Sequence, residues 1–173
     1  MNLPSFFIHP PAFQAALVHR SYCNEHPGVE SNERLEFLGD SVLSVIISDR
    51  LYRLLPQKPE GELTARRSYL VQTSSLAQKS KDLGLDKLLL LSHGEEDSGG
   101  RTNPGLLANT FEAVLGAMYL DSGLAACQDY LSQIFPDSDL VADSLSSKDP
   151  KSRLQELSQS RGWGTPSYAI VSA

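Results

Sequence analysis

The chain is poor in cysteine and shows no metal-ligand spacing of cysteine or histidine. Its two cysteines, Cys23 and Cys127, stand far apart and outside any C-x-x-C pair, which argues against a disulfide framework and a cysteine zinc site. No H-x-x-x-H or related spacing and no Ser/His/Asp set is present among the four histidines His9, His19, His26 and His93. We therefore expect structural roles for these residues and a reducing compartment.

Long hydrophobic runs are also missing. The longest, around residues 42–47 and 88–91, are far shorter than the roughly 20 apolar residues that span a bilayer. The N-terminal stretch MNLPSFFIHPP lacks a basic segment and is broken by prolines, so it does not resemble a signal peptide. These absences predict a cytoplasmic protein with no membrane partner.

An excess of positive charge is absent too. The chain has 21 acids against 15 lysines and arginines, and its net charge of −6 is opposite to the sign that attracts nucleic acid. At 173 residues and 40% hydrophobic composition, it suits one folded domain and not wholesale disorder. Binding to nucleic acid would require that many of the acids serve a metal site.

The most informative stretch is NERLEFLGD at residues 32–40. Glu33, Glu36 and Asp40 are spaced i, i+3, i+7, which confines them to an arc of roughly 60° on a helix. The opposite side of this helix is apolar, with Leu35, Leu38, Val42 and Ile46. Like charges at such spacing destabilise a helix by about 0.2–0.5 kcal/mol per pair. The stripe therefore predicts a compensating cation, and oxygen-ligated Mg²⁺ is the best candidate.

A second predicted helix repeats this arrangement. Pro104 is a suitable first helical residue, and Asn109 and Glu112 lie i, i+3 on the side opposite an apolar stripe. Gly116 continues the polar side without a Cβ, so something can approach closely there. Two helices that each offer two oxygen ligands are a known way to build a cation site. A single pair is more often a solvated acidic face, but the combination favours a metal site.

Nearly every periodic segment of the chain is helical, which predicts an all-α fold. The expected helices cover residues 13–22, 32–55, 62–83 (as one or two helices), 104–123 and 124–135. Gly84 suits the C′ position after the third of these. Residues 93–103 lack periodicity and are predicted to be a loop, and the polar run after Pro136 a linker. Strand-like alternation is confined to the last eight residues.

Five ordered segments carry a family resemblance. They are ALVHRSYCNE at 16–25, NERLEFLGD at 32–40, EGELTARRSYLV at 60–71, HGEEDSGG at 93–100 and LLANTFEAVLGAMYLDSG at 106–123. Together they resemble the endonuclease domain of bacterial ribonuclease III. Because the matches keep their order through residues 12–135, chance is a poor explanation.

The resemblance implies an all-α ribonuclease III endonuclease domain that forms a homodimer and cuts double-stranded RNA. It implies Mg²⁺, with Mn²⁺ as a substitute, and no small-molecule organic cofactor. Metal ligands would be Glu36, Asp40, Glu112 and the residue at 109, with Asp40 and Glu112 catalytic. This chain has Asn109 where most bacterial members have Asp, so one negative charge is missing. The implied products have 5′-phosphate and 3′-hydroxyl ends with a short 3′ overhang, from rRNA and other RNA processing.

Other family positions admit alternative roles. Phe37 lies well away from the apolar stripe of its helix; it is either held in a side pocket of the same fold or, as the resemblance implies, a dimer-interface residue. Glu33 and Glu60 resemble positions linked to RNA processing, although Glu33 also suits a first-turn acid that complements the helix dipole. Arg66 and Arg67 follow the Glu60 turn and either touch phosphates or simply solvate a helix.

The C-terminal part holds a second, incomplete resemblance. Residues 149–171, DPKSRLQELSQSRGWGTPSYAIV, are similar to the first helix and the start of the first strand of a double-stranded-RNA-binding domain, which reads A-form RNA by shape. We therefore divide the chain into an endonuclease domain with linker, residues 1–147, and a truncated α/β RNA-binding domain, residues 148–173.

The sequence leaves two competing functions open. One is a catalytically weak or inactive ribonuclease III-like protein that binds structured RNA, which Asn109 and the truncated C-terminal module favour. The other is an unrelated helical protein whose acids merely solvate it, which the ordered segments make improbable.

Overall fold

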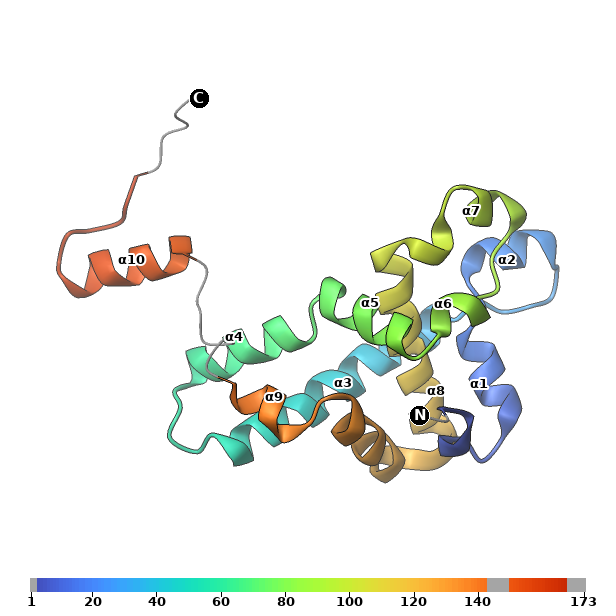
Figure 1. The fold of residues 1–173 in the computed structure, drawn as a ribbon, viewed down its shortest axis with the longest axis horizontal. Coiled ribbons are helices and arrows are strands. Elements are labelled where there is room, and N and C mark those ends of the chain that lie inside the picture. The colour runs from blue at the N-terminus through green and yellow to red at the C-terminus, as the bar shows by residue number, and fades with distance from the viewer. Residues whose placement is uncertain (1–2, 143–149, 168–173) are drawn as a thin grey trace.

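The computed structural model describes residues 3–142 and 150–167. Its elements, drawn in Figure 1, are η1 (Leu3–Phe6), α1 (Pro10–Ala16), α2 (Arg20–Glu25), α3 (Glu33–Leu54), α4 (Glu60–Leu70), α5 (Thr73–Asp82), α6 (Leu85–Leu88), α7 (His93–Asp97), η2 (Gly100–Thr102), α8 (Pro104–Ile134), α9 (Asp137–Val141) and α10 (Pro150–Ser160). Within these residues, β structure is limited to one parallel bridge between Val18 and Leu90. The all-α prediction is confirmed. No described helix is both long and apolar enough to cross a membrane.

The two longest helices, α3 and α8, form the centre of the fold, and α1 and α5 pack against α8 (Figure 1). The apolar stripe predicted for α3 faces this centre: Val42 and Ile46 are buried, and Leu35 and Leu38 pack against the core from its edge. The facing part of α8 contributes the fully buried side chains of Phe111, Val114, Leu115 and Met118. Each such side chain stabilises the fold by about 1.5–3 kcal/mol relative to exposure.

The backbones of α3 and α8 touch at a pair of glycines. A Cβ on Gly39 would overlap the carbonyl oxygen of Glu112 and lie 2.9 Å from the backbone nitrogen of Gly116. A Cβ on Gly116 would in turn overlap the carbonyl oxygen of Leu35. The close approach expected at Gly116 is therefore made by α3 itself, and only glycine fits at either position.

The helix predicted over residues 13–22 is wrong as a single element, because the chain breaks between α1 and α2. The connecting residues pair with a distant segment: the backbone nitrogen of His19 donates to Leu90 (3.1 Å), and that of Leu90 donates to Leu17 (3.0 Å). These hydrogen bonds replace those of a continuing helix. The pairing joins residues 71 or more positions apart, so local periodicity could not reveal it.

Residues 93–103 are not a plain loop, as predicted, but contain the short elements α7 and η2. Ser92 caps α7 by accepting a hydrogen bond from the backbone nitrogen of Glu95 (3.2 Å). Arg101 donates to both carboxylate oxygens of Glu96, at 2.6 and 3.1 Å, and to two backbone carbonyls of the α6 segment. Polar capping and an ion pair, not an apolar stripe, hold this segment in shape.

The predicted linker after Pro136 begins with a helix, α9, that packs onto the domain. Its Leu140 is fully buried. Arg66, also buried at 1% exposure, pairs with Glu62 and donates to the carbonyls of Leu140 (3.2 Å) and Ala142 (3.0 Å). The expectation that Arg66 is an exposed base near phosphate is therefore wrong; its guanidinium ties α4 to the end of α9.

The remaining helix boundaries agree with the sequence pattern. Residues 62–83 form two helices, α4 and α5, and Gly84 adopts the left-handed conformation (φ 73°) after the second. Gly123 interrupts α8 with φ 80°, close to where one predicted helix ends and the next begins. The C-terminal α10 forms where the RNA-binding-domain resemblance implies a helix, whereas the implied strand around Tyr168 and Ile170 lies outside the described residues.

Substituting alanine for Gly39 or Gly116 tests the helix contact. Each added methyl must push α3 and α8 apart, so each variant should lose at least about 1–3 kcal/mol of unfolding free energy, the usual effect of overpacking, as measured by urea denaturation. Gly61→Ala is the matched control, because nothing lies within 4 Å of its added Cβ; it should stay within about 1 kcal/mol of the natural chain. Equal stability of all three variants would contradict a contact that requires glycine.

Candidate functional site

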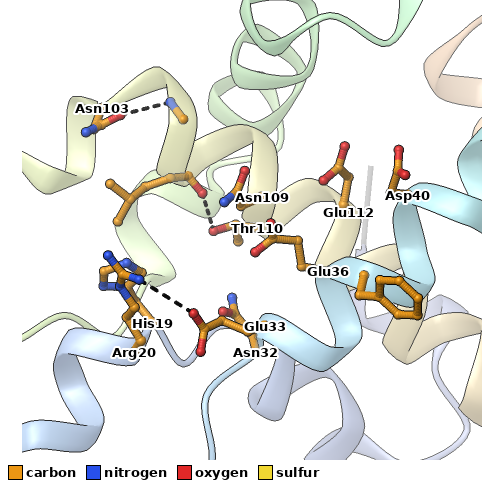
Figure 2. Close-up of a pocket in the computed structure, with 13 residues that line it drawn as sticks. His19, Arg20, Asn32, Glu33, Glu36, Asp40, Asn103, Asn109, Thr110 and Glu112 are labelled. Atoms are coloured by element: carbon orange, nitrogen blue, oxygen red, sulfur yellow. Dashed lines mark hydrogen bonds and ion pairs between the residues drawn. The ribbon is translucent and has the colours of Figure 1, made fainter.

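The crossing of α3 and α8 opens onto a cleft of ≈ 820 Å³ whose wall also includes the start of α2 (Figure 2). The cleft brings together six of the seven residues proposed from the sequence, namely Glu33, Glu36, Phe37, Asp40, Asn109 and Glu112. The first four come from α3 and the last two from α8. The glycine contact is adjacent to these positions, because Gly39 precedes Asp40 on α3 and a Cβ on Gly39 would overlap the backbone of Glu112 on α8. It therefore sets the spacing of the acids across the cleft.

Glu60 is the proposed residue that the structure does not bring to this cleft. It lies at the start of α4, beside a separate depression of ≈ 340 Å³ between α3 and α4. There its carboxylate accepts a hydrogen bond from Thr64 Oγ1 at 2.8 Å. Arg67 lines the same depression and donates to Ser48 Oγ at 2.8 Å.

The start of α3 is fixed to the preceding chain by Asn32. This side chain is buried at 4% exposure and donates from Nδ2 to the carbonyl of Ala16 (2.9 Å), while its backbone nitrogen donates to Val18 (2.9 Å). Both bonds join α3 to the segment between α1 and α2. They fix the positions of Glu33 and Glu36 relative to the part of the cleft wall that the start of α2 forms.

Burial and neighbouring negative charge raise the pKa values of two acids of the cleft, Glu112 and Glu36. Burial, helped by the charges of Asp40 and Glu36, raises the pKa of Glu112 to about 7. Burial also raises the pKa of Glu36, as does Glu33, whereas the Asn109 amide opposes this as a hydrogen-bond donor. Among the described residues, the carboxylates of Glu36, Asp40 and Glu112 have no ion-pair partner. The cleft therefore carries concentrated negative charge.

This donor set suits a hard divalent cation in chemistry, because three carboxylates and one amide supply only oxygen ligands and an unbalanced negative charge. The side chains are not gathered around one point: Figure 2 shows Asp40 and Glu112 pointing the same way and Glu36 turned toward Asn109. Accordingly, no three acidic, histidine or cysteine side chains in the described part of the chain converge on a ready-made metal position. Binding of one ion by all three carboxylates would require side-chain rotation at Glu36.

The fold and cleft define an all-α protein with an acidic, oxygen-lined site between two crossed helices. Comparison with known proteins narrows this class. Residues 11–138 match the family described as Ribonuclease-III-like. The chain belongs to the ribonuclease III family, as the resemblance of its five segments predicts.

Individual relatives agree with this assignment. Ribonuclease 3 of Streptomyces coelicolor is 44% identical over 157 residues, which cover 90% of this chain and 57% of that protein. Ribonuclease 3 of a Geobacillus strain is 46% identical over 169 residues, covering 96% of this chain and 68% of that protein. The chain thus spans somewhat more than half the length of the first relative and about two thirds of the second.

Among solved structures, the fold is similar to the nuclease domain of ribonuclease III from Campylobacter jejuni. The TM-score is 0.71 at 32% sequence identity, and the match covers 76% of this chain and 92% of that one. That structure is described in terms of flexibility in a region involved in dimer formation.

The cleft also contains two basic residues that were not selected from the sequence, His19 and Arg20. Histidine spacing gave no reason to choose His19, because its neighbours in the cleft come from distant parts of the chain. The segment ALVHRSYCNE, already noted for its family resemblance, was the one available signal.

The raised pKa of Glu112 predicts a pH-dependent stability in EDTA. The folded chain holds the Glu112 proton more tightly than the unfolded chain does. The stability that this proton contributes is therefore complete below pH 4.5 and is lost as the pH rises through about 7. Glu112→Gln cannot ionise and should exceed the natural chain in unfolding free energy at pH 8 by about 1–2 kcal/mol after allowance for solvent screening. Urea denaturation at pH 8 and pH 5 should show this advantage shrinking at the lower pH; a constant difference would contradict the electrostatic coupling.

Proposed function

We propose that this chain is a divalent-metal-dependent endoribonuclease that hydrolyses phosphodiester bonds in double-stranded RNA. The observation that carries the proposal is that Glu36 and Asp40 from α3 and Glu112 from α8 line one cleft, without basic ion-pair partners among the described residues. Membership of the ribonuclease III family supports it. The structural similarity to a nuclease domain supports the same reaction class.

Four side chains of the cleft have a role in this proposal. Glu36, Asp40 and Glu112 would hold Mg²⁺, or Mn²⁺ in its place, with the carbonyl oxygen of the Asn109 side chain as a weaker ligand. When bound, such an ion lowers the pKa of an attacking water and neutralises charge on the phosphate. Asp40 and Glu112 are the catalytic carboxylates. The half-buried Glu112 is the better shielded from solvent, and Asp40 is exposed at the cleft mouth.

The proposed products carry 5′-phosphate and 3′-hydroxyl ends with short 3′ overhangs, and the proposed setting is rRNA and other RNA processing in the cytoplasm. An overhang requires two cutting centres on opposite strands, and a homodimer would supply one centre from each copy. The C-terminal residues 148–173, which include α10, are proposed to be the beginning of a double-stranded-RNA-binding domain that would add RNA affinity.

A weak or inactive RNA-binding relative is the second candidate function, and Asn109 is the observation that favours it. The amide stands beside Glu36 and donates a hydrogen bond toward it, so this position adds no negative charge. An amide oxygen attracts a dication less than a carboxylate does. Lower metal affinity is the expected consequence.

Phe37 supports the homodimer part of the proposal. Its side chain is 78% exposed on the surface of α3 beside the cleft, so the alternative of a side pocket within the same chain does not apply. A large aromatic side chain left in solvent is suited to a self-complementary contact with a second copy.

Incubation of the purified protein with a long RNA duplex and Mg²⁺ separates the candidate functions. Cleavage that stops on chelation by EDTA supports the endonuclease. Duplex binding without cleavage supports the RNA-binding relative, and the absence of both would leave only a helical protein with a solvated acidic face.

Restoring a carboxylate at position 109 should strengthen metal binding. In Asn109→Asp, cleavage should reach half its maximal rate at a Mg²⁺ concentration lower by roughly fivefold or more, because one further charged ligand faces the ion. The rate is measured against Mg²⁺ concentration for both proteins. Superimposable curves would remove Asn109 from the metal site.

Placing a charge at position 37 should prevent dimer formation. In Phe37→Glu, two carboxylates would meet in the self-complementary contact, and light scattering should report a monomer where the natural chain gives a dimer. Val45→Glu is the matched control, because Val45 is another exposed apolar residue of α3, at 61% exposure. It tests whether the effect is local to position 37. A Phe37→Glu dimer of unchanged mass would refute the assignment.

A further inference from the structure

The acidic cleft presents an electrostatic problem for an RNA substrate. Its carboxylates repel the phosphate backbone, and a bound dication neutralises only part of that charge. Among the described residues that line the cleft, the basic ones are His19 and Arg20. In Figure 2 these two side chains stand together on the wall facing Asn109 and Thr110.

His19 is held in place from several directions. Its backbone nitrogen donates to Leu90, and its ring Nδ1 lies 3.2 Å from the backbone nitrogen and 2.8 Å from the Oγ of Ser21. Ser21 Oγ itself accepts a hydrogen bond from the backbone nitrogen of Ser92 (3.0 Å). The imidazole is therefore fixed by α2, by the β bridge and by the start of α7.

These contacts determine which ring nitrogen of His19 carries the proton. The backbone nitrogen of Ser21 can only donate, so Nδ1 must accept. In the neutral ring the proton then lies on Nε2, which becomes a hydrogen-bond donor. Burial, helped by the positive charge of Arg20, lowers the pKa of His19 and outweighs the opposing charges of Glu95 and Glu33, which favours this neutral form.

Nε2 of His19 has no hydrogen-bond partner within the described chain, although Nδ1 is fully engaged. A rigid ring with its free N–H on the wall of an otherwise acidic cleft is suited to an anionic oxygen. The requirement is for a donor, which carboxylates and the metal cannot supply.

Arg20 adds an exposed positive charge beside this donor. Its guanidinium lies 3.7 Å from Glu33, and the two side chains are 73% and 56% exposed. An exposed pair at this distance is weak, typically about 0–1 kcal/mol. Arg20 can therefore leave Glu33 for a phosphate at little cost.

We propose that His19 and Arg20 form a phosphate-binding wall of the cleft, on which His19 Nε2 donates a hydrogen bond to a non-bridging phosphate oxygen of RNA and Arg20 moves from Glu33 to pair with the backbone. The inference rests on the proposed action on RNA. It assigns His19 and Arg20 to substrate binding, separate from the carboxylates that hold the metal.

Two substitutions at position 19 test the two ring nitrogens of the imidazole separately. His19→Asn keeps an acceptor for the Ser21 backbone nitrogen, since asparagine is a favoured helix N-cap, but it has no donor in the place of Nε2. His19→Gln keeps an amide N–H near the place of Nε2 but loses the acceptor near Nδ1. We expect His19→Asn to unfold close to the natural chain yet bind RNA about tenfold more weakly, the loss of one hydrogen bond to a charged group.

His19→Gln should show the opposite pattern, with a lower unfolding temperature and RNA affinity nearer to that of the natural chain. Binding is measured by fluorescence anisotropy on a labelled RNA duplex, in a Glu112→Gln background with Mg²⁺ so that the strands stay intact. A purely structural role for His19 reverses this order of affinities, and that result would overturn the proposal.

The salt dependence of binding tests Arg20. A residue that neutralises one phosphate changes the slope of log affinity against log salt by about one, so Arg20→Ala should reduce the slope by that amount. Arg53→Ala is the matched control, because Arg53 is 75% exposed, pairs with Asp49 at 2.9 Å and lies at the other end of α3. Equal slopes for the two variants would remove Arg20 from the RNA contact.

Failure of the proposed function is distinguishable from failure of this inference. If the natural chain binds the duplex without cutting it, the nuclease proposal fails, while the position 19 and position 20 comparisons still decide the binding wall. If the natural chain cuts the duplex but His19→Asn binds it normally, only the inference fails. If the natural chain does not bind the duplex at all, both are overturned.

Discussion

The backbone contact between Gly39 and Gly116 is the constraint on which the rest of the structure depends. It lets α3 and α8 approach until a Cβ at either position would overlap the other helix. On one side of the contact lies the core, with Ile46 and Phe111 fully or nearly fully buried. On the other side lies the acidic cleft. The same approach that completes the core therefore forces carboxylates of two helices together.

Packing outweighs the resulting repulsion. Each large apolar side chain buried between the helices stabilises the fold by about 1.5–3 kcal/mol, and many do so. The electrostatic cost is concentrated in Glu112. Its pKa is raised to about 7 by burial and by the charges of Asp40 and Glu36. This cost amounts to a few kcal/mol at most once solvent screening is allowed for. The fold can therefore hold an acidic cluster that a cation would stabilise. The His19 wall complements that cluster, because it offers hydrogen-bond donors whereas the carboxylates offer acceptors.

Much of this arrangement was predictable from the sequence because it follows from helical periodicity. The acid and apolar stripes of α3, the start of α8 at Pro104 and the turn at Gly84 are all local patterns with a direct physical meaning. Gly116 indicated a close approach, although the sequence could not say that α3 makes it at Gly39. The break before α2, the burial of Arg66 and the cleft position of His19 depend on contacts between distant segments, which leave no periodic trace. Glu60, chosen by resemblance, lies beside a different depression.

The most direct test of the account is the position of a metal ion in a crystal of the protein soaked with Mn²⁺, located by its anomalous scattering. Helices held together at the glycine pair should give a manganese peak in the cleft, bonded to carboxylate oxygens from both α3 and α8, with Glu36 rotated away from Asn109. A peak bonded to one helix alone, or manganese found only elsewhere on the surface, would contradict the claim that this helix contact builds the site.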